Sequence, residues 1–324
     1  MRAMTKGTLA LLITGMTENW SPARWRERFI RVCADRPVAL LPADPVAPAA
    51  VRYAAVWKPK PGALAAFPNL AAIFNLGAGV DALIADASLP DVPVVRVADA
   101  DLTGRMTEYV AMHVLMHHRR QRYLDRCQRE RAWAPQAQPA ASAVRVGIMG
   151  LGVLGADAAQ VLARLGFKVA GWSRSRKAVP GIAAYAGDAE LAAFLERTDI
   201  LVCLLPLTPA TKGILNRRTF AQLARDGALG GPVVINAGRG GLQVEADLVA
   251  ALDDGTLAAA SLDVFETEPL PAASPLWSHP KVTISPHNAA DTDPDAISVY
   301  VAEEIARHER GEPLRNLVDR RLGY

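Results

Sequence analysis

Cysteine is scarce in this sequence of 324 residues, which contains only Cys33, Cys127 and Cys203. Their spacing fits neither a C-x-x-C redox motif nor a set of zinc ligands. We therefore expect all three to be reduced thiols. Long apolar runs are also missing, since no stretch approaches the roughly 20 residues that a membrane-spanning helix needs. The apolar run at residues 8–14 is short for a signal peptide, and no small-residue cleavage site follows it. We therefore expect a soluble protein of the cytoplasm.

An excess of charge of either sign is missing as well, with 36 lysines and arginines against 33 acidic residues and a net charge of +3. This balance gives no support for a nucleic-acid partner, although it suits small anionic ligands. Hydrophobic residues make up 51% of the chain, which excludes a disordered protein. No internal repeat of solenoid period is present, and the length predicts two domains.

The first hundred residues alternate between strand-like and helical patterns, which predicts a small parallel sheet covered by helices. Ser21 and Pro22 open a helical stretch as an N-cap residue and a proline in the first turn. A tight turn is expected at residues 77–79, after the third strand. The expected strands are residues 9–14, 51–57, 70–75 and 92–97.

From about Thr103 a long helical segment runs toward Arg131, and a connector rich in proline and alanine follows at residues 135–143. The remaining chain alternates again between strands and helices. The expected helices are residues 188–196, 216–225, 245–253 and 295–309. The expected strands are residues 144–149, 168–172, 200–205, 233–237, 259–264 and 282–285.

A glycine-rich turn, Gly150-Leu151-Gly152-Val153-Leu154-Gly155, joins the strand at 144–149 to an amphipathic helix that stops at Gly166. Strand, G-x-G-x-x-G turn and helix in this order form the dinucleotide-binding fingerprint. The glycines allow a tight turn, a close approach of backbone to a pyrophosphate and close packing of helix on strand. The helix start then offers free N–H groups to the phosphates.

The residues after the second strand of this unit indicate which dinucleotide is bound. Dinucleotide-binding folds usually place an acidic residue about 20 positions beyond the glycines, where it binds the ribose 2′-hydroxyl. Here Ser173 occupies that position and is followed by Arg174, Ser175, Arg176 and Lys177. A hydroxyl with guanidinium groups would bind a 2′-phosphate, which a carboxylate would repel. The sequence therefore favours NADP(H) over NAD(H).

Three consecutive strand ends supply a guanidinium, a carboxylate and an imidazole. Arg239 lies in Asn236-Ala237-Gly238-Arg239-Gly240, Glu268 lies beyond Asp263-Val264-Phe265, and His287 ends Ser285-Pro286-His287. Ligands of open α/β sheets bind just beyond these carboxyl ends. The set suits reduction of a 2-oxo acid. Arg239 would hold the substrate carboxylate or polarise its carbonyl, His287 would protonate the developing alkoxide, and Glu268 would keep the imidazole protonated near neutral pH.

Two other patterns are given a structural interpretation. His113, His117 and His118 include an i, i+4 pair that could chelate a metal, but no further ligand accompanies it, so we expect no metal site. The basic stretch at residues 119–131 is interrupted by acidic residues and predicts a solvated or dimer-forming helix.

The sequence resembles the D-isomer-specific 2-hydroxyacid dehydrogenases over nearly its whole length, and within them the glyoxylate/hydroxypyruvate reductase A subgroup. The segments that carry the resemblance are Asn75-Leu76-Gly77-Ala78-Gly79-Val80-Asp81, residues 106–120, the glycine turn, Trp172-Ser173-Arg174-Ser175, Leu204-Leu205-Pro206, and residues 236–240, 263–269 and 285–287. The family's usual acid after the second strand is missing here. Residues 288 and 291–295 also differ from the family pattern.

The resemblance implies two doubly wound, Rossmann-like parallel-sheet α/β domains. A flavodoxin-like substrate-binding domain would comprise residues 1–102 and 290–324, and an NADP-binding Rossmann domain residues 103–289. It also implies a homodimer with the helix after Thr103 at the two-fold interface.

The implied activity is NADPH-dependent reduction of small 2-oxo acids, glyoxylate to glycolate and hydroxypyruvate to D-glycerate, with His287 as general acid. Arg239, Glu268 and His287 would be catalytic. The substrate would contact Trp57, Ala78, Gly79, Arg239 and His287. The cofactor, NADPH rather than NADH, would contact Gly150, Gly152, Val153, Leu154, Gly155, Ser173, Arg174, Ser175, Leu205, Pro206, Ala237, Asp263 and His287.

Two alternatives stay open at this point. The first keeps the fold but takes another 2-hydroxy acid or a small anion such as formate or phosphite. The second is a dinucleotide-sensing binding protein without turnover.

Overall fold

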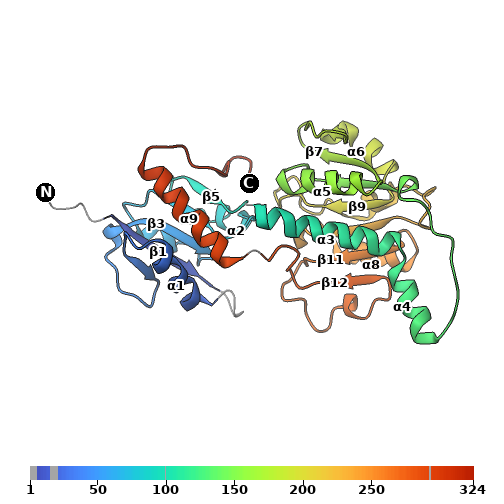
Figure 1. Ribbon diagram of the computed structural model, residues 1–324, viewed down its shortest axis with the longest axis horizontal. Helices are drawn as coiled ribbons and strands as arrows, with labels where there is room; N and C mark the ends of the chain where they lie inside the picture. The colour runs from blue at the N-terminus through green and yellow to red at the C-terminus, as the bar shows by residue number, and fades with distance from the viewer. Residues whose placement is uncertain (1–5, 15–20, 99, 292) are drawn as a thin grey trace. The chain divides into compact units, whose positions relative to one another are not determined.

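The computed structural model describes residues 6–14, 21–98, 100–291 and 293–324 (Figure 1). The chain divides into two compact units, one formed by Met1–Leu102 with Thr292–Tyr324 and the other by Thr103–Asp291. Each unit is built on one parallel sheet with helices packed on it. The predicted fold class is therefore confirmed.

The first unit has a five-stranded sheet in the order β2-β1-β3-β4-β5, which is the doubly wound order of flavodoxin-like folds. Its strands are β1 (Thr8–Ile13), β2 (Val38–Leu40), β3 (Val51–Trp57), β4 (Ala72–Asn75) and β5 (Val94–Arg96). Its helices are α1 (Pro22–Val32), α2 (Asp81–Ile84) and α9 (Pro294–Glu309). Four strands lie where the sequence predicts them. The short β2, between Pro37 and Pro42, was not predicted because three residues carry no measurable alternation.

Helix α1 shows how the local sequence shapes this unit. Pro22 occupies its first turn, and Ser21 precedes it in an extended conformation without a side-chain cap hydrogen bond. Trp25 and Phe29 lie four residues apart and therefore on one face. Both are completely buried, and their rings stack with centroids 5.9 Å apart. Helix α9 packs beside α1, so the C-terminal segment completes the first unit.

The second unit has a seven-stranded sheet in the order β12-β11-β10-β9-β6-β7-β8. Counted from β6 within this unit, the first six strands have the 3-2-1-4-5-6 order of a dinucleotide-binding fold, and the order reverses between β6 and β9. The strands are β6 (Arg145–Met149), β7 (Lys168–Ser173), β8 (Ala183–Ala186), β9 (Ile200–Cys203), β10 (Val233–Asn236), β11 (Ala259–Leu262) and β12 (Val282–Ile284). The helices are α3 (Ala100–His118), α4 (Gln121–Glu130), α5 (Val153–Arg164), α6 (Gly187–Glu196), α7 (Arg217–Ala221) and α8 (Glu245–Asp253).

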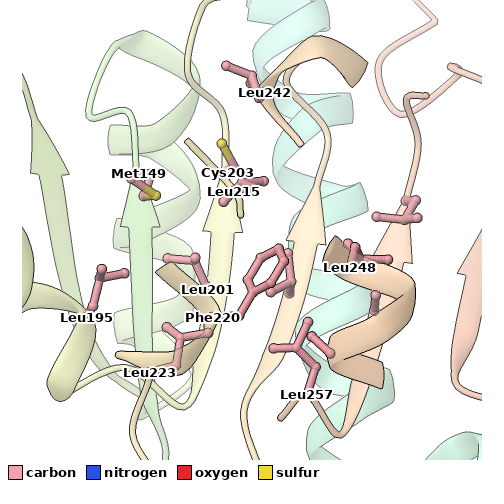
Figure 2. Close-up of a cluster of buried hydrophobic side chains, with 14 of the residues drawn as sticks. Met149, Leu195, Leu201, Cys203, Leu215, Phe220, Leu223, Leu242, Leu248 and Leu257 are labelled. Carbon is pink, nitrogen blue, oxygen red and sulfur yellow. The ribbon is translucent and has the colours of Figure 1, made fainter. Parts of the chain in front are cut away.

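The strands of the second unit are apolar on both faces because helices cover both sides of the sheet. Leu201 and Cys203 of β9 enter a cluster that also contains Phe220, Leu248 and Leu257 (Figure 2). Ile200 and Val202, the alternate residues of the same strand, enter a cluster with residues of α3 and α5. Both clusters are fully buried at these β9 positions. This packing fixes the strand ends on which the predicted site residues lie.

The structure of the second unit differs from the prediction in three places. The single helix expected from Thr103 toward Arg131 is two helices, because Arg120 has a left-handed conformation with φ 55°. No glycine or proline marks this break in the sequence. The edge strand β8 was not predicted, and α7 is shorter than expected. None of the helices among the described residues is long and apolar enough to cross a membrane.

Candidate functional site

The glycine turn lies at the carboxyl end of β6, next to the point where the strand order reverses. Gly150 has φ +105°, a conformation that favours glycine, and a Cβ atom there would lie 2.8 Å from the carbonyl oxygen of Leu204. A Cβ atom on Gly155 would lie only 1.9 Å from the carbonyl oxygen of Gly150. The turn and the start of α5 are therefore packed too closely for any side chain at these two positions.

The middle glycine differs from its neighbours. A Cβ atom on Gly152 would meet nothing within 4 Å among the described residues, so the space in front of it is open. Gly152 is also the N-cap of α5, which begins at Val153. Val153 is 58% exposed, and Leu154 is half-buried. The turn therefore presents open backbone at the start of a 12-residue helix, a surface that suits a phosphate group.

The residues predicted to bind the 2′-phosphate lie in the turn after β7, and they differ in exposure. Ser173 is 8% exposed, and its hydroxyl donates to the carbonyl oxygen of Ser175 at 2.8 Å. Arg174 and Ser175 are exposed. Arg176, in contrast, donates to the carbonyl oxygen of Ala184 at 2.5 Å and pairs with Glu190. Arg176 thus ties the turn to β8 and α6, and Arg174 lies on the surface of the same turn.

The ends of β9 and β10 bring three further predicted residues to the same edge of the sheet. Leu205 and Ala237 are nearly buried, at 6% each, and Pro206 is half-buried. The carbonyl oxygen of Pro206 accepts a hydrogen bond from the Thr211 hydroxyl at 2.7 Å, which fixes the loop after β9.

Arg239 follows β10 and is held by a buried amide network that the sequence analysis did not identify. The amide nitrogen of Asn236 donates to the carbonyl oxygen of Arg239 at 3.1 Å and to Oε1 of Gln243 at 2.9 Å. Oδ1 of Asn236 accepts the N–H of Gly238 at 3.1 Å. Asn236 is completely buried and Gln243 is 2% exposed. The backbone of Arg239 is therefore fixed, while its guanidinium is half-exposed and donates to the carbonyl oxygen of Gly238.

Glu268 and His287 follow the two neighbouring strands, β11 and β12, and they form a pair. Oε2 of Glu268 lies 2.6 Å from Nδ1 of His287. Oε1 of the same carboxylate accepts the N–H of Phe265 at 3.1 Å. The His287 side chain is 39% exposed, and its Nε2 has no hydrogen-bond partner in the described part of the chain. This edge of the sheet therefore carries Arg239 after β10 and an oriented imidazole after β12.

The loop that carries His287 is anchored by Asp263, at the end of β11. Oδ1 of Asp263 accepts the N–H groups of Asn288 at 3.0 Å and Ala289 at 3.2 Å, and its carbonyl oxygen accepts the N–H of His287 at 2.8 Å. Asp263 is 2% exposed. His287 itself has φ +54°, a left-handed conformation that costs a residue with a side chain about 1–2 kcal/mol. These hydrogen bonds hold the loop in that conformation.

The same carboxylate is connected to helix α3 through two hydroxyl groups. The Ser285 hydroxyl donates to Oδ1 of Asp263 at 2.7 Å and lies 2.9 Å from the Tyr109 hydroxyl. Burial raises the pKa of Tyr109. No local pattern in the sequence indicates the role of Ser285 or that of Tyr109.

The predicted substrate residues of the first unit lie near one another within that unit. Trp57 ends β3, and Ala78 and Gly79 follow the adjacent strand β4. A Cβ atom on Gly77 would lie 2.4 Å from Cζ3 of Trp57, so the indole packs on this loop. Nζ of Lys58 lies 5.6 Å from the centre of the indole ring.

Two of the histidines of α3, His113 and His117, contact the sheet. Nδ1 of His113 and Nε2 of His117 each lie 2.9 Å from the hydroxyl of Ser261, a completely buried residue of β11. Burial lowers the pKa of His113 to about 4, and burial together with the nearby His113 and Arg122 lowers that of His117 to about 3. Within the described ranges no group of three or more potential metal ligands occurs.

The second unit is an open parallel sheet with a glycine turn at its switch point. A guanidinium and an imidazole–carboxylate pair lie at its strand ends. This combination defines a dinucleotide-dependent oxidoreductase. Residues 111–289 match the family described as D-isomer specific 2-hydroxyacid dehydrogenase, NAD binding domain. Glyoxylate/hydroxypyruvate reductase A of Serratia proteamaculans (strain 568) is 44% identical over 278 residues, which cover 84% of this chain and 87% of that protein. The chain belongs to the D-isomer specific 2-hydroxyacid dehydrogenase family.

Solved structures agree with this assignment. A probable 2-hydroxyacid dehydrogenase from Rhizobium etli CFN 42, in complex with NADP, HEPES and L(+)-tartaric acid, has a TM-score of 0.92 and 47% identity, covering 98% of this chain and 99% of that one. NADPH-dependent glyoxylate/hydroxypyruvate reductase from Sinorhizobium meliloti, in complex with NADP and sulfate, has a TM-score of 0.90 and 45% identity, covering 98% and 100%.

Proposed function

We propose that this protein reduces small 2-oxo acids with NADPH, converting glyoxylate to glycolate and hydroxypyruvate to D-glycerate. The observation that carries the proposal is the pair formed by Glu268 and His287, on the sheet edge that also holds Arg239 and the glycine turn. The relatives named as glyoxylate/hydroxypyruvate reductases support the choice of substrates. The second unit would bind the cofactor and the first unit the substrate carboxylate.

The residues of the second unit fit NADPH. The open backbone at Gly152 and the start of α5 would hold the pyrophosphate. Ser173, Arg174 and Ser175 would hold the 2′-phosphate, and the absence of a carboxylate at position 173 removes the group that would repel it. The loops at Leu205, Pro206 and Ala237, together with Asp263, would line the rest of the site. Two similar structures contain NADP, which agrees with this choice.

The chemistry divides between the cofactor and the side chains. When bound, NADPH supplies the hydride that reduces the carbonyl carbon of the 2-oxo acid. His287 donates a proton from Nε2 to the carbonyl oxygen as the alkoxide forms. Glu268 holds the ring through Nδ1 and so leaves Nε2 available to the substrate. Arg239 binds the substrate carboxylate or polarises the carbonyl, and the products are the 2-hydroxy acid and NADP⁺.

A spectrophotometric assay of NADPH and NADH oxidation with glyoxylate, hydroxypyruvate and pyruvate tests this function. We expect turnover of glyoxylate and hydroxypyruvate with a preference for NADPH. Activity with NADH alone would contradict the argument from Ser173, Arg174 and Ser175. Tight binding of NADPH without turnover of any 2-oxo acid would identify a dinucleotide-sensing protein instead, and turnover of only formate, phosphite or a bulkier acid would change the substrate.

We also propose that the protein is a homodimer that associates through α3, α4 and the segment after α4. Met112, Leu124 and Trp133 support this, because they are 56%, 48% and 98% exposed on these elements. Light scattering coupled to size-exclusion chromatography tests the proposal, and a mass of 34.6 kDa, that of one chain, would contradict it.

A further inference from the structure

The loop after β4 is shaped by one buried side chain, that of Asn75. Its amide nitrogen donates to the carbonyl oxygen of Gly77 at 2.7 Å and to that of Gly79 at 3.0 Å. Asn75 is 4% exposed and is the last residue of β4. A buried amide that donates to two carbonyl groups of one short loop determines how the peptide groups of that loop are oriented.

The orientation of the N–H groups follows from peptide geometry. In a planar trans peptide the C=O and N–H bonds point in opposite directions. Because the carbonyl groups of Gly77 and Gly79 point at Asn75, the N–H groups of the same peptide units, those of Ala78 and Val80, point away from it. Neither of these N–H groups, nor that of Gly79, donates a hydrogen bond within the described part of the chain.

We infer that Asn75 is a positioning residue: it fixes the loop at residues 77–80 so that the N–H groups of Ala78, Gly79 and Val80 stay available to the carboxylate of a 2-oxo acid. The inference rests on the proposed function and sharpens it, since it names the side chain that fixes this loop. Backbone N–H groups can bind an anion without any charged side chain. The Trp57 indole also packs on the loop, at Gly77.

This role predicts a particular kinetic signature. The carboxylate does not react, so the loop binds it equally in the ground state and in the transition state, and loss of that contact raises KM with little change in kcat. In Asn75→Ala the two carbonyl groups lose their shared donor and the loop is free to reorient. We expect the KM for glyoxylate to rise about tenfold, the effect of one lost hydrogen bond, while kcat and the KM for NADPH stay close to wild type.

The experiment compares wild type, Asn75→Ala, Asn75→Ser and a matched control, Asn69→Ala. Asn69 also donates from its side-chain amide to a carbonyl oxygen of the first unit, that of Ala49 at 2.7 Å, but lies on the surface before β4. Each variant is assayed with glyoxylate, and the dissociation constant of oxalate is measured by calorimetry with NADP⁺ present. Asn75→Ser keeps one donor, so its KM for glyoxylate should lie between those of wild type and Asn75→Ala. It also provides the test if Asn75→Ala does not fold.

The expected result is a parallel rise of the glyoxylate KM and the oxalate dissociation constant in the Asn75 variants, with Asn69→Ala unchanged. Unchanged values in both Asn75 variants, a fall in kcat alone, or an equal effect of Asn69→Ala would overturn the inference. Weaker oxalate binding in Asn75→Ala beside a wild type that reduces no 2-oxo acid would sustain the inference and reject the proposed reaction. If the wild type reduces glyoxylate but the Asn75 variants have the same KM and oxalate dissociation constant as wild type, the proposed reaction is sustained and the inference about Asn75 is rejected.

Discussion

Nδ1 of His287 lies 2.6 Å from Oε2 of Glu268, and the other oxygen of that carboxylate accepts the N–H of Phe265. The carboxylate is thus fixed by the backbone at the end of β11 and presents its charge to the imidazole. An imidazole held through one nitrogen directs the other toward a substrate.

Replacement of His287 by alanine removes the proposed proton donor, so kcat/KM for glyoxylate should fall by about 10²–10⁴-fold. A matched control is His279→Ala, which breaks another imidazole–carboxylate pair, with Nε2 of His279 3.3 Å from Oδ1 of Asp253. The control should retain activity. Steady-state kinetics with NADPH measure both variants, and full activity of His287→Ala would reject the mechanism.

Replacement of Glu268 by glutamine keeps the shape of the side chain but removes its charge. The imidazole then loses its charged partner. We expect kcat/KM for glyoxylate to fall in Glu268→Gln, but less than in His287→Ala, because the proton donor itself is still present. Steady-state kinetics with NADPH measure this loss. An unchanged kcat/KM would show that the charge of Glu268 has no part in the reaction.

The two arginines after β7 should differ in their effect on cofactor choice. Arg174→Ala removes a charged donor to the 2′-phosphate, a loss of about 1.5–3 kcal/mol, and should raise the KM for NADPH by about 10- to 150-fold with little effect on NADH. Arg176→Ala should have a smaller effect, because Arg176 is engaged with Ala184 and Glu190. Measurement of the KM for NADPH and for NADH in each variant tests this prediction. An equal rise of both KM values in Arg174→Ala would argue against a phosphate contact.

Replacement of Asp263 by asparagine should disturb the loop that holds His287. The new amide cannot accept as many of the N–H and O–H groups that now bond to the carboxylate. A buried donor left without an acceptor costs about 1–3 kcal/mol. We expect a lower free energy of unfolding and a lower kcat. Urea denaturation and steady-state kinetics measure both effects. Ser285→Ala, which removes a single donor, should lower the free energy of unfolding by less. An Asp263→Asn variant as stable and as active as wild type would contradict this role of Asp263.

The stability of the protein should fall in acid because of the histidines on α3. Burial lowers the pKa of His113 from 6.5 to about 4, so between these values the unfolded chain binds the proton and the folded chain does not. The free energy of unfolding therefore decreases as the pH falls from 6.5 to 4, by up to about 1.4 kcal/mol per pH unit for this residue, and is unaffected by it at higher pH. His113→Gln removes this contribution. Urea denaturation at several pH values should give a shallower decline in the variant, and an identical decline would exclude His113.

Local patterns in the sequence are sufficient for the outline of the fold and for the chemical groups of the site. Alternation of strands and helices predicts both parallel sheets, and the spacing of the glycines predicts the turn at the switch point of the second sheet. The same patterns do not predict the helical break at Arg120 or the strands β2 and β8. Short features of this kind are stabilised by their neighbours in the fold rather than by their own propensity.

The positions of atoms in the site depend on tertiary structure. Nothing local indicates that Arg176 bonds to Glu190, or that Asp263 holds the loop of His287. These contacts join residues that are 14 and 25 positions apart in the chain, and they form only when the strands and helices of the second unit are packed together.

By itself the sequence therefore determined that this chain has two parallel sheets, a dinucleotide-binding turn, and an arginine, a glutamate and a histidine at strand ends. Only the tertiary structure decided that Asp263 holds the loop of His287 and that Asn75 orients the loop of Ala78. The physical reason is that secondary structure follows from the pattern of neighbouring residues, whereas a hydrogen bond between side chains depends on distances that packing alone sets.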